Sequence, residues 1–306
     1  MKLALCMVVK DEIDRIVDCL DPVHGLVDQI VVIDTGSSDG TPDLLRRRYG
    51  IEPLDGVLEE ARCYCKCDQR NRAIGLAEAD WILSLDADER IAPEALHHFR
   101  AMRHAPDVAG YFGRWTNHLD GAPPFEDYKL FLFRKGLRKR GLVHDNAQID
   151  IRERGQRALW LQGLEVTHLP DPAKAPDKTR LYRRRLERAI ALEPDWLRYR
   201  WFLGYMDYQA GRWDEAAKHL AAAAGDSGLF PVESLNSRLL LAEIQARQGR
   251  AAEARATLVA ALDYYQAVAS DFEVAINFRL APWLRQALAT VDAGQPETIR
   301  AYRFAR

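Results

Sequence analysis

The stretch that decides the fold is WILSLDADE, Trp81–Glu89, in which five apolar or small residues lead directly into three carboxylates. An uninterrupted run of this kind is typical of a strand that is buried on both faces of a parallel sheet. Two earlier runs, Leu3–Val9 and Gln29–Asp34, have the same character and predict two more strands. The sequence therefore predicts an α/β sheet whose strands end in polar loops.

Helical stretches separate these runs, which indicates a sheet covered by helices on both faces. We expect helices over Ile13–Leu20, Thr41–Tyr49, Gln69–Ala79 and Pro93–Met102. The pair Thr41-Pro42 is a helix-start signal. Beyond residue 107 we expect strands over Val108–Trp115, Lys129–Arg134, Gly141–Ala147 and Leu164–His168. Together these elements predict one α/β domain with a mixed sheet over residues 1–170.

The composition fits two globular domains, because 306 residues correspond to two domains of about 150. Apolar residues make up 48% of the chain, and 43 basic against 45 acidic side chains leave a net charge of -2. This balance argues against a disordered chain and against a nucleic-acid-binding protein. The mean hydropathy is -0.31, and no apolar run approaches the ~18 residues of a membrane span. We expect no transmembrane segment.

The run Leu3–Val9 resembles a signal peptide, but Lys10, Asp11 and Glu12 follow it without a small-residue cleavage site. A buried first strand is the better interpretation. The five cysteines are an odd number in a chain too long to need cross-links, so we expect reduced thiols. Both observations favour a cytoplasmic protein.

Cys63, Cys65 and Cys67 form a C-x-C-x-C pattern. On an extended strand this spacing places the sulfurs on one side, where they could bind zinc. Structural zinc usually prefers C-x2-C spacing with a second pair, which favours the alternative of reduced cysteines in a loop.

The segment Leu169–Lys178 holds three prolines in ten residues and predicts a linker at 171–178, with a second domain over 179–306. That second part is helical and repeats. The positions Gly204, Gly211, Glu215, Leu220 and Ala223 recur 38 residues later as Ala242, Gly249, Glu253, Leu258 and Ala261. Leu186 and Ala189 precede Leu220 and Ala223 by 34 residues. A period near 34 resembles the tetratricopeptide repeat, in which stacked helix pairs share a core. We expect the extra residues of the longer spacing in the loop Gly225–Glu233.

The loop after the second predicted strand, DTGSSDGT, runs from Asp34 to Thr41. In an open α/β sheet, ligands bind at the carboxyl ends of strands. The Gly36-Ser37 part exposes backbone N–H groups, and Asp34 could accept a hydrogen bond from a base or ribose. The alternative is a turn and helix cap, in which Asp39 to Thr41 simply connect two elements.

The acidic residues Asp86, Asp88 and Glu89 follow the third strand. Neighbouring carboxylates in a poorly solvated cleft raise one another's pKa unless a cation compensates. A Mg²⁺ or Mn²⁺ ion that bridges to a diphosphate would compensate them. The alternative is an acidic loop in water.

Four motifs in this order, VVKDE, IVVIDTGSSDGT, RNRAI and ADWILSLDADE, resemble the family-two glycosyltransferases of the GT-A fold. With the repeats, the chain resembles the bacterial branch that carries tetratricopeptide repeats after the catalytic domain. That branch includes lipopolysaccharide-core glucosyltransferases and peptide S-glycosyltransferases. The resemblance implies a GT-A domain with a Rossmann-like mixed sheet, followed by an all-α domain.

The resemblance also implies roles for single residues. The implied nucleotide-sugar-binding residues are Asp11, Glu12, Asp34, Thr35, Gly36, Ser37, Arg70, Asn71, Asp86, Ala87 and Arg134. Asp88 is the implied direct ligand of Mn²⁺ or Mg²⁺, with Asp86, His144 and His168 as further candidates. For the two histidines, structural packing is the alternative. The wider family commonly has two aspartates where this chain has Asp34-Thr35.

Downstream, YKLFLFRKGLRKRGLVHD resembles a strand Arg-Leu-Phe-Arg that leads to Gly-x-Val-His-Glu. Phe131 stands where the branch often has the first arginine, and Asp145 replaces the glutamate. Sugar transfer needs a carboxylate that takes the acceptor proton. Asp145 is the first candidate for this base and Asp127 the reserve. The basic loop that begins at Arg134 would be a flap over the diphosphate or a solvated turn.

The resemblance thus predicts an inverting, metal-dependent enzyme that moves a hexose from a nucleotide sugar, a UDP-hexose, to a glycan, lipopolysaccharide or peptide acceptor. The repeats would bind the acceptor or form a homodimer. A nucleotidyl transfer fits the same carboxylates less well. The remaining alternative is a repeat-based adaptor with an inactive glycosyltransferase-like domain.

Overall fold

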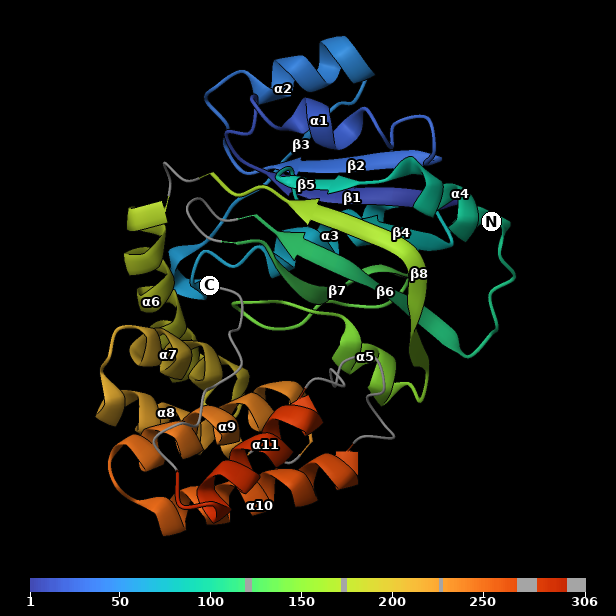
Figure 1. Ribbon diagram of the computed structural model, residues 1–306. Coiled ribbons are helices and arrows are strands. Elements are labelled where there is room, and N and C mark those ends of the chain that lie inside the picture. The colour runs from blue at the N-terminus through green and yellow to red at the C-terminus, as the bar shows by residue number, and fades with distance from the viewer. Residues whose placement is uncertain (119–122, 172–174, 226–227, 269–279, 296–306) are drawn as a thin grey trace. The chain divides into compact units, whose positions relative to one another are not determined.

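The computed structural model describes residues 1–118, 123–171, 175–225, 228–268 and 280–295. The chain divides into two compact units at Lys178/Thr179, and each is described by itself. The first unit holds an eight-stranded sheet with helices, and the second is helical (Figure 1).

The elements of the first unit follow one another in an irregular alternation. They are β1 (Leu3–Val9), α1 (Ile16–Leu20), β2 (Gln29–Asp34), α2 (Thr41–Leu44) with its π-helical continuation Leu45–Tyr49, β3 (Leu54–Asp55), the 3-10 turn Glu60–Arg62, α3 (Cys67–Leu76), β4 (Trp81–Ser84), β5 (Glu89–Ile91), α4 (Pro93–Ala101), β6 (Val108–Asn117), β7 (Phe125–Arg134), α5 (Gln148–Glu153) and β8 (Arg157–His168).

The strand order is β3-β2-β1-β4-β7-β6-β8-β5. Strands β1 to β4 are parallel, whereas β7 runs antiparallel to both β4 and β6, and β5 runs antiparallel to β8. Because β8 is parallel to β6, the carboxyl ends of β1, β2, β4, β6 and β8 share one edge with the starts of β5 and β7. The loops at this edge hold most of the predicted site residues.

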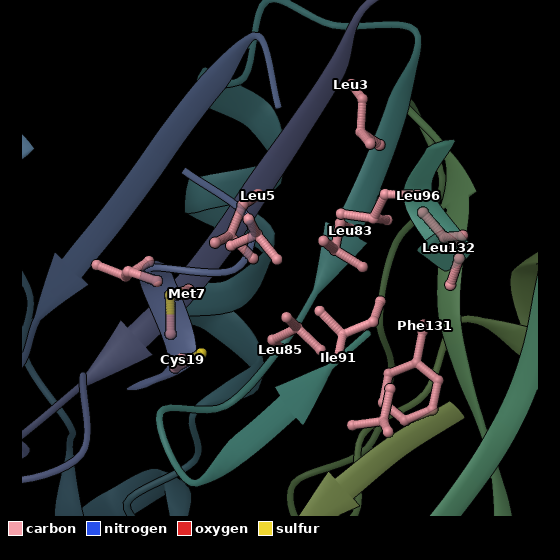
Figure 2. Packing of buried hydrophobic residues seen from close by; sticks show 14 of the residues in the cluster. Leu3, Leu5, Met7, Cys19, Leu83, Leu85, Ile91, Leu96, Phe131 and Leu132 are labelled. Atoms are coloured by element: carbon pink, nitrogen blue, oxygen red, sulfur yellow. The ribbon is translucent and has the colours of Figure 1, made fainter. Parts of the chain in front are cut away.

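A hydrophobic layer explains why these strands associate. All seven residues of β1 are buried, as the uninterrupted apolar run predicted. Figure 2 shows Leu5 and Met7 of β1 in the same cluster as Leu83 of β4 and Phe131 of β7. Each fully buried side chain of this size contributes roughly 1.5–3 kcal/mol relative to exposure. The cluster therefore stabilises the parallel and antiparallel halves of the sheet as one body.

One predicted strand in the later part of this unit is wrong, and one helix was not predicted. Gly141–Ala147 is a loop with a single bridge between Arg140 and Asn146, and α5 follows it without having been predicted. Gly141 (φ 108°) and His144 (φ 54°) have left-handed backbone conformations, which a regular strand excludes. The short strands β3 and β5 were also missed.

The second unit contains six described helices, α6 (Ala175–Leu192), α7 (Arg198–Gln209), α8 (Trp213–Ala224), α9 (Pro231–Arg247), α10 (Ala251–Val268) and α11 (Leu280–Asp292). The end of α7 and the start of α8 recur in α9 and α10 at the predicted spacing. Gly211 and Gly249 follow α7 and α9 with φ of 71° and 75°. A Cβ on Gly204 would lie 3.0 Å from Leu220, so this helix crossing needs a small residue. The predicted helical repeat domain is confirmed.

Helix α6 begins at Ala175, so the end of the predicted linker is helical and Pro176 lies in its first turn, where proline is tolerated. Residues 172–174 of that linker lie outside the described part. Among the described residues, no helix combines the length and apolarity that a membrane crossing requires.

Candidate active site

The loop after β2 holds a carboxylate with one vacant oxygen. Asp34 Oδ1 accepts hydrogen bonds from the backbone N–H groups of Gly36 and Ser37, both at 2.8 Å. Asp34 Oδ2 is buried and has no hydrogen-bond partner among the described residues. A buried polar atom without a partner costs about 1–3 kcal/mol. A ligand that donates an N–H or O–H here would remove that cost.

The loops after β1 and β2 are tied together. Ser38 N donates to Asp11 Oδ1 (2.7 Å), Asp11 N donates to Ser37 Oγ (2.8 Å), and Glu12 N donates to Thr41 Oγ1 (3.0 Å). These bonds give Asp11 and Glu12 a structural role, whatever ligand they contact.

The side chains of Thr35 and Asp39 also form hydrogen bonds with backbone groups in or beside these loops. The Thr35 hydroxyl donates to Val9 O at 3.0 Å. Asp39 accepts from Thr41 N at 2.9 Å and from Ile13 N at 2.9 Å. The predicted alternative of a turn and helix cap therefore describes Asp39 and Thr41, whereas Asp34 keeps a free oxygen for a ligand.

The acidic turn between β4 and β5 is compensated by side chains of the chain itself. Arg70 donates to Asp86 Oδ1 at 2.7 Å, and the Lys129 ammonium lies 3.4 Å from Asp86 Oδ2. Burial alone would raise the pKa of Asp86, but the charges of Arg70 and Lys129 hold it well below its usual range. Asp86 therefore needs no metal ion to stay ionised.

Glu89 and Lys129 form the innermost ion pair of the turn, 2.5 Å between Oε1 and Nζ. The Glu89 side chain is only 1% exposed, and burial raises its pKa. Its second oxygen accepts from Asp86 N at 2.9 Å, which fixes the shape of the turn.

Lys129 was missing from the predicted site. It lies 5.3 Å from the Phe131 ring, on the same face of β7, because alternate residues of a strand share a face. Phe131 itself is fully buried in the core. Lys129 thus brings a cation to the face of β7 on which Phe131 lies, and the period of two in the strand was the available signal.

Asp88 faces His168, whose Nε2 lies 3.3 Å from Asp88 Oδ2. His168 Nδ1 lies 2.7 Å from Asn117 Oδ1, and the Trp115 ring stacks on the imidazole at 4.8 Å. The roles of the two ring nitrogens depend on the tautomer of His168. Nε2 can donate a hydrogen bond to Asp88 or, when Nδ1–H donates to Asn117, offer its lone pair to a cation that it shares with Asp88.

This pair fits a divalent metal ion. A carboxylate oxygen and an imidazole nitrogen are suitable ligands for Mn²⁺, and the hydrogen bond from Nδ1 is the outer contact that metal-bound histidines usually make. No group of three protein ligands is found among the described residues. Substrate phosphates would complete the coordination, as is usual for such ions. His144 is exposed in the loop after β7 and belongs to no group of three or more metal-binding side chains within the described part of the chain.

Asp145 is buried between two cations. Its side chain is 5% exposed, and its oxygens lie 2.6 Å from Arg70 and 3.4 Å from the Lys139 ammonium. Burial would raise its pKa, but Arg70 and Lys139 lower it. A buried carboxylate with a lowered pKa is a weak base. The geometry therefore disfavours Asp145 as the general base and favours a role in orienting Arg70.

The Asn71 amide is bonded to the backbone of Lys139. Its Oδ1 accepts from Lys139 N (2.8 Å) and its Nδ2 donates to Lys139 O (2.9 Å). The amide thereby holds the loop that carries Asp145. Cys67 Sγ lies 3.1 Å from the same carbonyl oxygen.

The three cysteines are buried and form no disulfide with one another. Cys63 and Tyr64 have φ of 59° and 51°, so the segment turns sharply and the extended strand required by the zinc interpretation is absent there. The prediction of cysteines in a loop describes Cys63 and Cys65, whereas Cys67 is the first residue of α3.

Asp127 lies near the start of β7 and is exposed. It pairs in register with Trp115 on β6, and alternation places it on the face of β7 that carries Lys129. Its Oδ1 accepts from Tyr128 N at 2.8 Å. Asp127 is therefore the accessible carboxylate beside the stack of Trp115 on His168.

Arg134 was predicted to bind the nucleotide, but it lies at the opposite end of β4 from the acidic turn. It pairs with Trp81 at the start of β4, whereas Asp86 follows the other end of that strand. Its guanidinium donates to Val108 O (2.9 Å) and Ala105 O (3.1 Å) and lies 4.7 Å from the Trp81 ring centre. Ala87 is buried, and its carbonyl oxygen accepts from Arg90.

The edge of the sheet thus combines a vacant aspartate oxygen after β2 with an acidic turn after β4. A family model described as Glycosyl transferase family 2 matches residues 4–161, more than half of the chain. The chain belongs to this family. It is a glycosyltransferase, and the resemblance inferred from the four motifs is confirmed.

Relatives extend the similarity to the helical unit. A TPR repeat-containing protein of Synechococcus elongatus is 27% identical over 309 residues, which cover 96% of this chain and 72% of the relative. An uncharacterized glycosyltransferase of Rickettsia felis is 29% identical over 96 residues, 30% of this chain and 31% of the relative.

Solved structures of S. aureus TarS are also similar. TarS 1-349 aligns with 100% of this chain and 94% of its own, with a TM-score of 0.45 and 12% identity. Its complex with UDP has a TM-score of 0.43 and 14% identity, with coverage of 100% and 94%. TM-scores at this level are too low to support an argument about function.

Proposed function

We propose that this glycosyltransferase is inverting and metal-dependent, and that it moves a hexose from a UDP-sugar to a glycan, lipopolysaccharide or peptide acceptor. The observation that carries the proposal is the Asp88–His168 pair, in which a carboxylate oxygen and an imidazole nitrogen lie 3.3 Å apart at the edge of the sheet where ligands bind. The vacant Asp34 Oδ2 on the same edge supports a nucleotide as the donor group.

In this proposal the donor nucleotide lies along the loops after β1 and β2. Asp34 Oδ2 accepts a hydrogen bond from the base or ribose. Asp86, held by Arg70, accepts from a ribose or sugar hydroxyl. Asp88 and His168 would hold Mn²⁺ or Mg²⁺, and the bound ion would supply positive charge for the departing diphosphate.

The chain's own part in the chemistry is to take a proton. The acceptor atom attacks the anomeric carbon from the face opposite the diphosphate, and the bond from that carbon to the phosphate oxygen breaks with its electron pair left on the oxygen. A carboxylate removes the acceptor proton, which typically contributes 10²–10⁴-fold. We assign this role to Asp127, because this residue is exposed and lies beside Trp115. The other candidate, Asp145, is buried between two cations.

Two further proposals concern the cellular compartment of the protein and the role of its helical repeats. Five buried cysteines that form no disulfide with one another support a reducing compartment such as the cytoplasm. The helical repeats would bind the acceptor or a second copy of the chain.

Donor hydrolysis tests the proposal. The purified protein is incubated with a panel of UDP-hexoses and Mn²⁺, and released UDP is measured. We expect release by the wild type and by Asp14→Asn, an exposed aspartate before α1. We expect at least a 100-fold loss in Asp88→Asn. An adaptor with an inactive domain would release no UDP from any donor.

Stabilisation of the protein by UDP gives an independent test of the proposed function. At about 100 times its dissociation constant, UDP should stabilise the protein by roughly 2.7 kcal/mol. The increase in melting temperature should need Mn²⁺ in the wild type and disappear in Asp88→Asn. An increase that is equal in both proteins would contradict Asp88 as the metal ligand.

A further inference from the structure

Lys66 lies immediately before α3, at the edge of the site. Arg70 N donates to Lys66 O at 2.8 Å, so the two residues are one helical turn apart. Residues four apart in a helix lie on the same face. The Arg70 guanidinium on that face contacts Asp86 and Asp145, which directs Lys66 toward the same cluster of carboxylates.

The electrostatic surroundings of Lys66 agree with this position. Its ammonium interacts with Asp86 after β4, with Glu12 after β1 and with Asp88. Burial lowers its pKa, and these three carboxylates act in the opposite direction. Lys66 therefore carries its charge toward the two loops that follow β1 and β4.

Every other cation of this cluster has a carboxylate partner. Arg70 pairs with Asp86 and Asp145, Lys139 with Asp145, and Lys129 with Glu89 and Asp86. Within the described part of the chain, Lys66 forms no ion pair within the 4.0 Å that defines one. Glu12, the third carboxylate near it, pairs with Arg15 at 3.7 Å.

An anion is the ligand that this arrangement suits. Lys66 is a point charge with three N–H donors on a flexible stem, which matches phosphate oxygens without a fixed geometry. Arg70 is less available, because both of its terminal nitrogens already donate to carboxylates.

We propose that Lys66 binds the diphosphate of the donor nucleotide and takes up charge on it as it leaves. The inference rests on the function proposed above. When the bond between the anomeric carbon and the phosphate oxygen breaks, the electron pair stays on that oxygen. Lys66 remains protonated and donates hydrogen bonds to the phosphate, while the acceptor proton goes to the base. Lys66 is a binding residue for the leaving group and transfers no proton.

Calorimetric titration tests the proposal with UDP and uridine as probes, in the presence of Mn²⁺. We expect Lys66→Met to weaken UDP binding about 10- to 100-fold, the range for a lost hydrogen bond to a charged group. Uridine, which has no phosphate, should bind within about 2-fold of the wild type. Lys66→Arg should recover most of the UDP affinity. Lys218→Met, an exposed lysine on α8, is the matched control and should bind like the wild type.

Chemical labelling tests the same proposal in the unmutated protein, should Lys66→Met fail to fold. An amine-reactive acylating reagent is applied with and without saturating UDP, and the peptide that contains Lys66 is quantified by mass spectrometry. We expect UDP to slow acylation of Lys66 at least 5-fold and uridine to leave it unchanged. Equal acylation with and without UDP would overturn the proposal.

The outcomes separate the two levels of inference. If wild-type protein binds UDP and Lys66→Met binds it equally well, only the role of Lys66 is overturned. If the wild type binds no nucleoside diphosphate with any divalent ion, the proposed function fails and the role of Lys66 with it. Equal weakening of UDP and uridine binding by Lys66→Met would also overturn a specific contact with the diphosphate.

Discussion

The two halves of β7 carry cations with opposite uses. In the first half, Lys129 pairs with Glu89 and Asp86 at the edge that holds the candidate active site. At its end, Arg134 donates to two backbone carbonyl oxygens and lies over the Trp81 ring. Both residues belong to one basic strand motif, yet only the first faces carboxylates. The partners of a cation, rather than its place in a motif, decide whether it belongs to a site or to the scaffold.

The largest effect that we expect concerns the site end of the strand. Asp127→Asn should lower kcat about 10²–10⁴-fold, because it removes the proposed base. The dissociation constant for UDP should change less than 2-fold, since Asp127 takes no part in donor binding. Steady-state kinetics and calorimetry measure the two quantities.

The variant Asp145→Asn tests the other candidate for the base. It should weaken stability, because Lys139 loses its buried partner, while the pH dependence of kcat stays as in the wild type. If Asp145→Asn stops transfer and Asp127→Asn does not, the base is Asp145, as the family resemblance implied.

A smaller effect is expected from Lys129→Met, which leaves Glu89 buried without a counter-charge. Removal of one partner of a buried pair costs about 3–5 kcal/mol. Protonation of Glu89 would offset part of this cost. The double variant Lys129→Met/Glu89→Gln should therefore be more stable than Lys129→Met alone. Urea unfolding measures both, and equal stabilities would show that the pair is not coupled.

At the other end of β7, Arg134→Gln should cost about 1–3 kcal/mol, because it removes two hydrogen bonds to carbonyl oxygens and the contact with Trp81. Activity per folded molecule should stay within 2-fold of the wild type. A selective loss of UDP affinity in this variant would restore the predicted nucleotide-binding role and break the contrast between the two halves of β7.

The smallest effect concerns the loop beyond Arg134. The pKa of Asp145 is lower in the folded protein than in the unfolded chain, where it is about 3.9. Its ion pairs therefore stabilise the fold at pH values above about 3.9, and this contribution is lost as the pH falls through the lower folded value. The melting temperature of the wild type should fall more between pH 6 and pH 3 than that of Asp145→Asn. Parallel curves would contradict the lowered pKa.

The parallel half of the sheet was predicted well because its strands are buried on both faces. The bounds of β1 and β2 match the apolar runs residue for residue. The antiparallel half was harder. The apolar pair Leu142-Val143 suggested a strand, but the left-handed backbone at Gly141 and His144 turns the chain into a loop.

The sequence also did not predict which charged side chains pair within the site. Lys129 lies 43 residues from Asp86 along the chain, and only the register of β7 against β4 brings them together. A lysine next to α3 or within β7 usually indicates a solvated surface. Asp34, Asp86 and Asp88, by contrast, were identified because each follows the carboxyl end of an apolar run.

The hydrogen bonds between the loops after β1 and β2 have a consequence for recognition kinetics. Ser37, Ser38 and Thr41 are held by side chains and amides from Asp11 and Glu12 before any donor arrives. The residues of these two loops therefore lost their conformational entropy during folding, and they lose little more when the donor binds. The donor should therefore bind to these loops without a large conformational change. The backbone amide of Ser38 should exchange slowly even in the ligand-free protein.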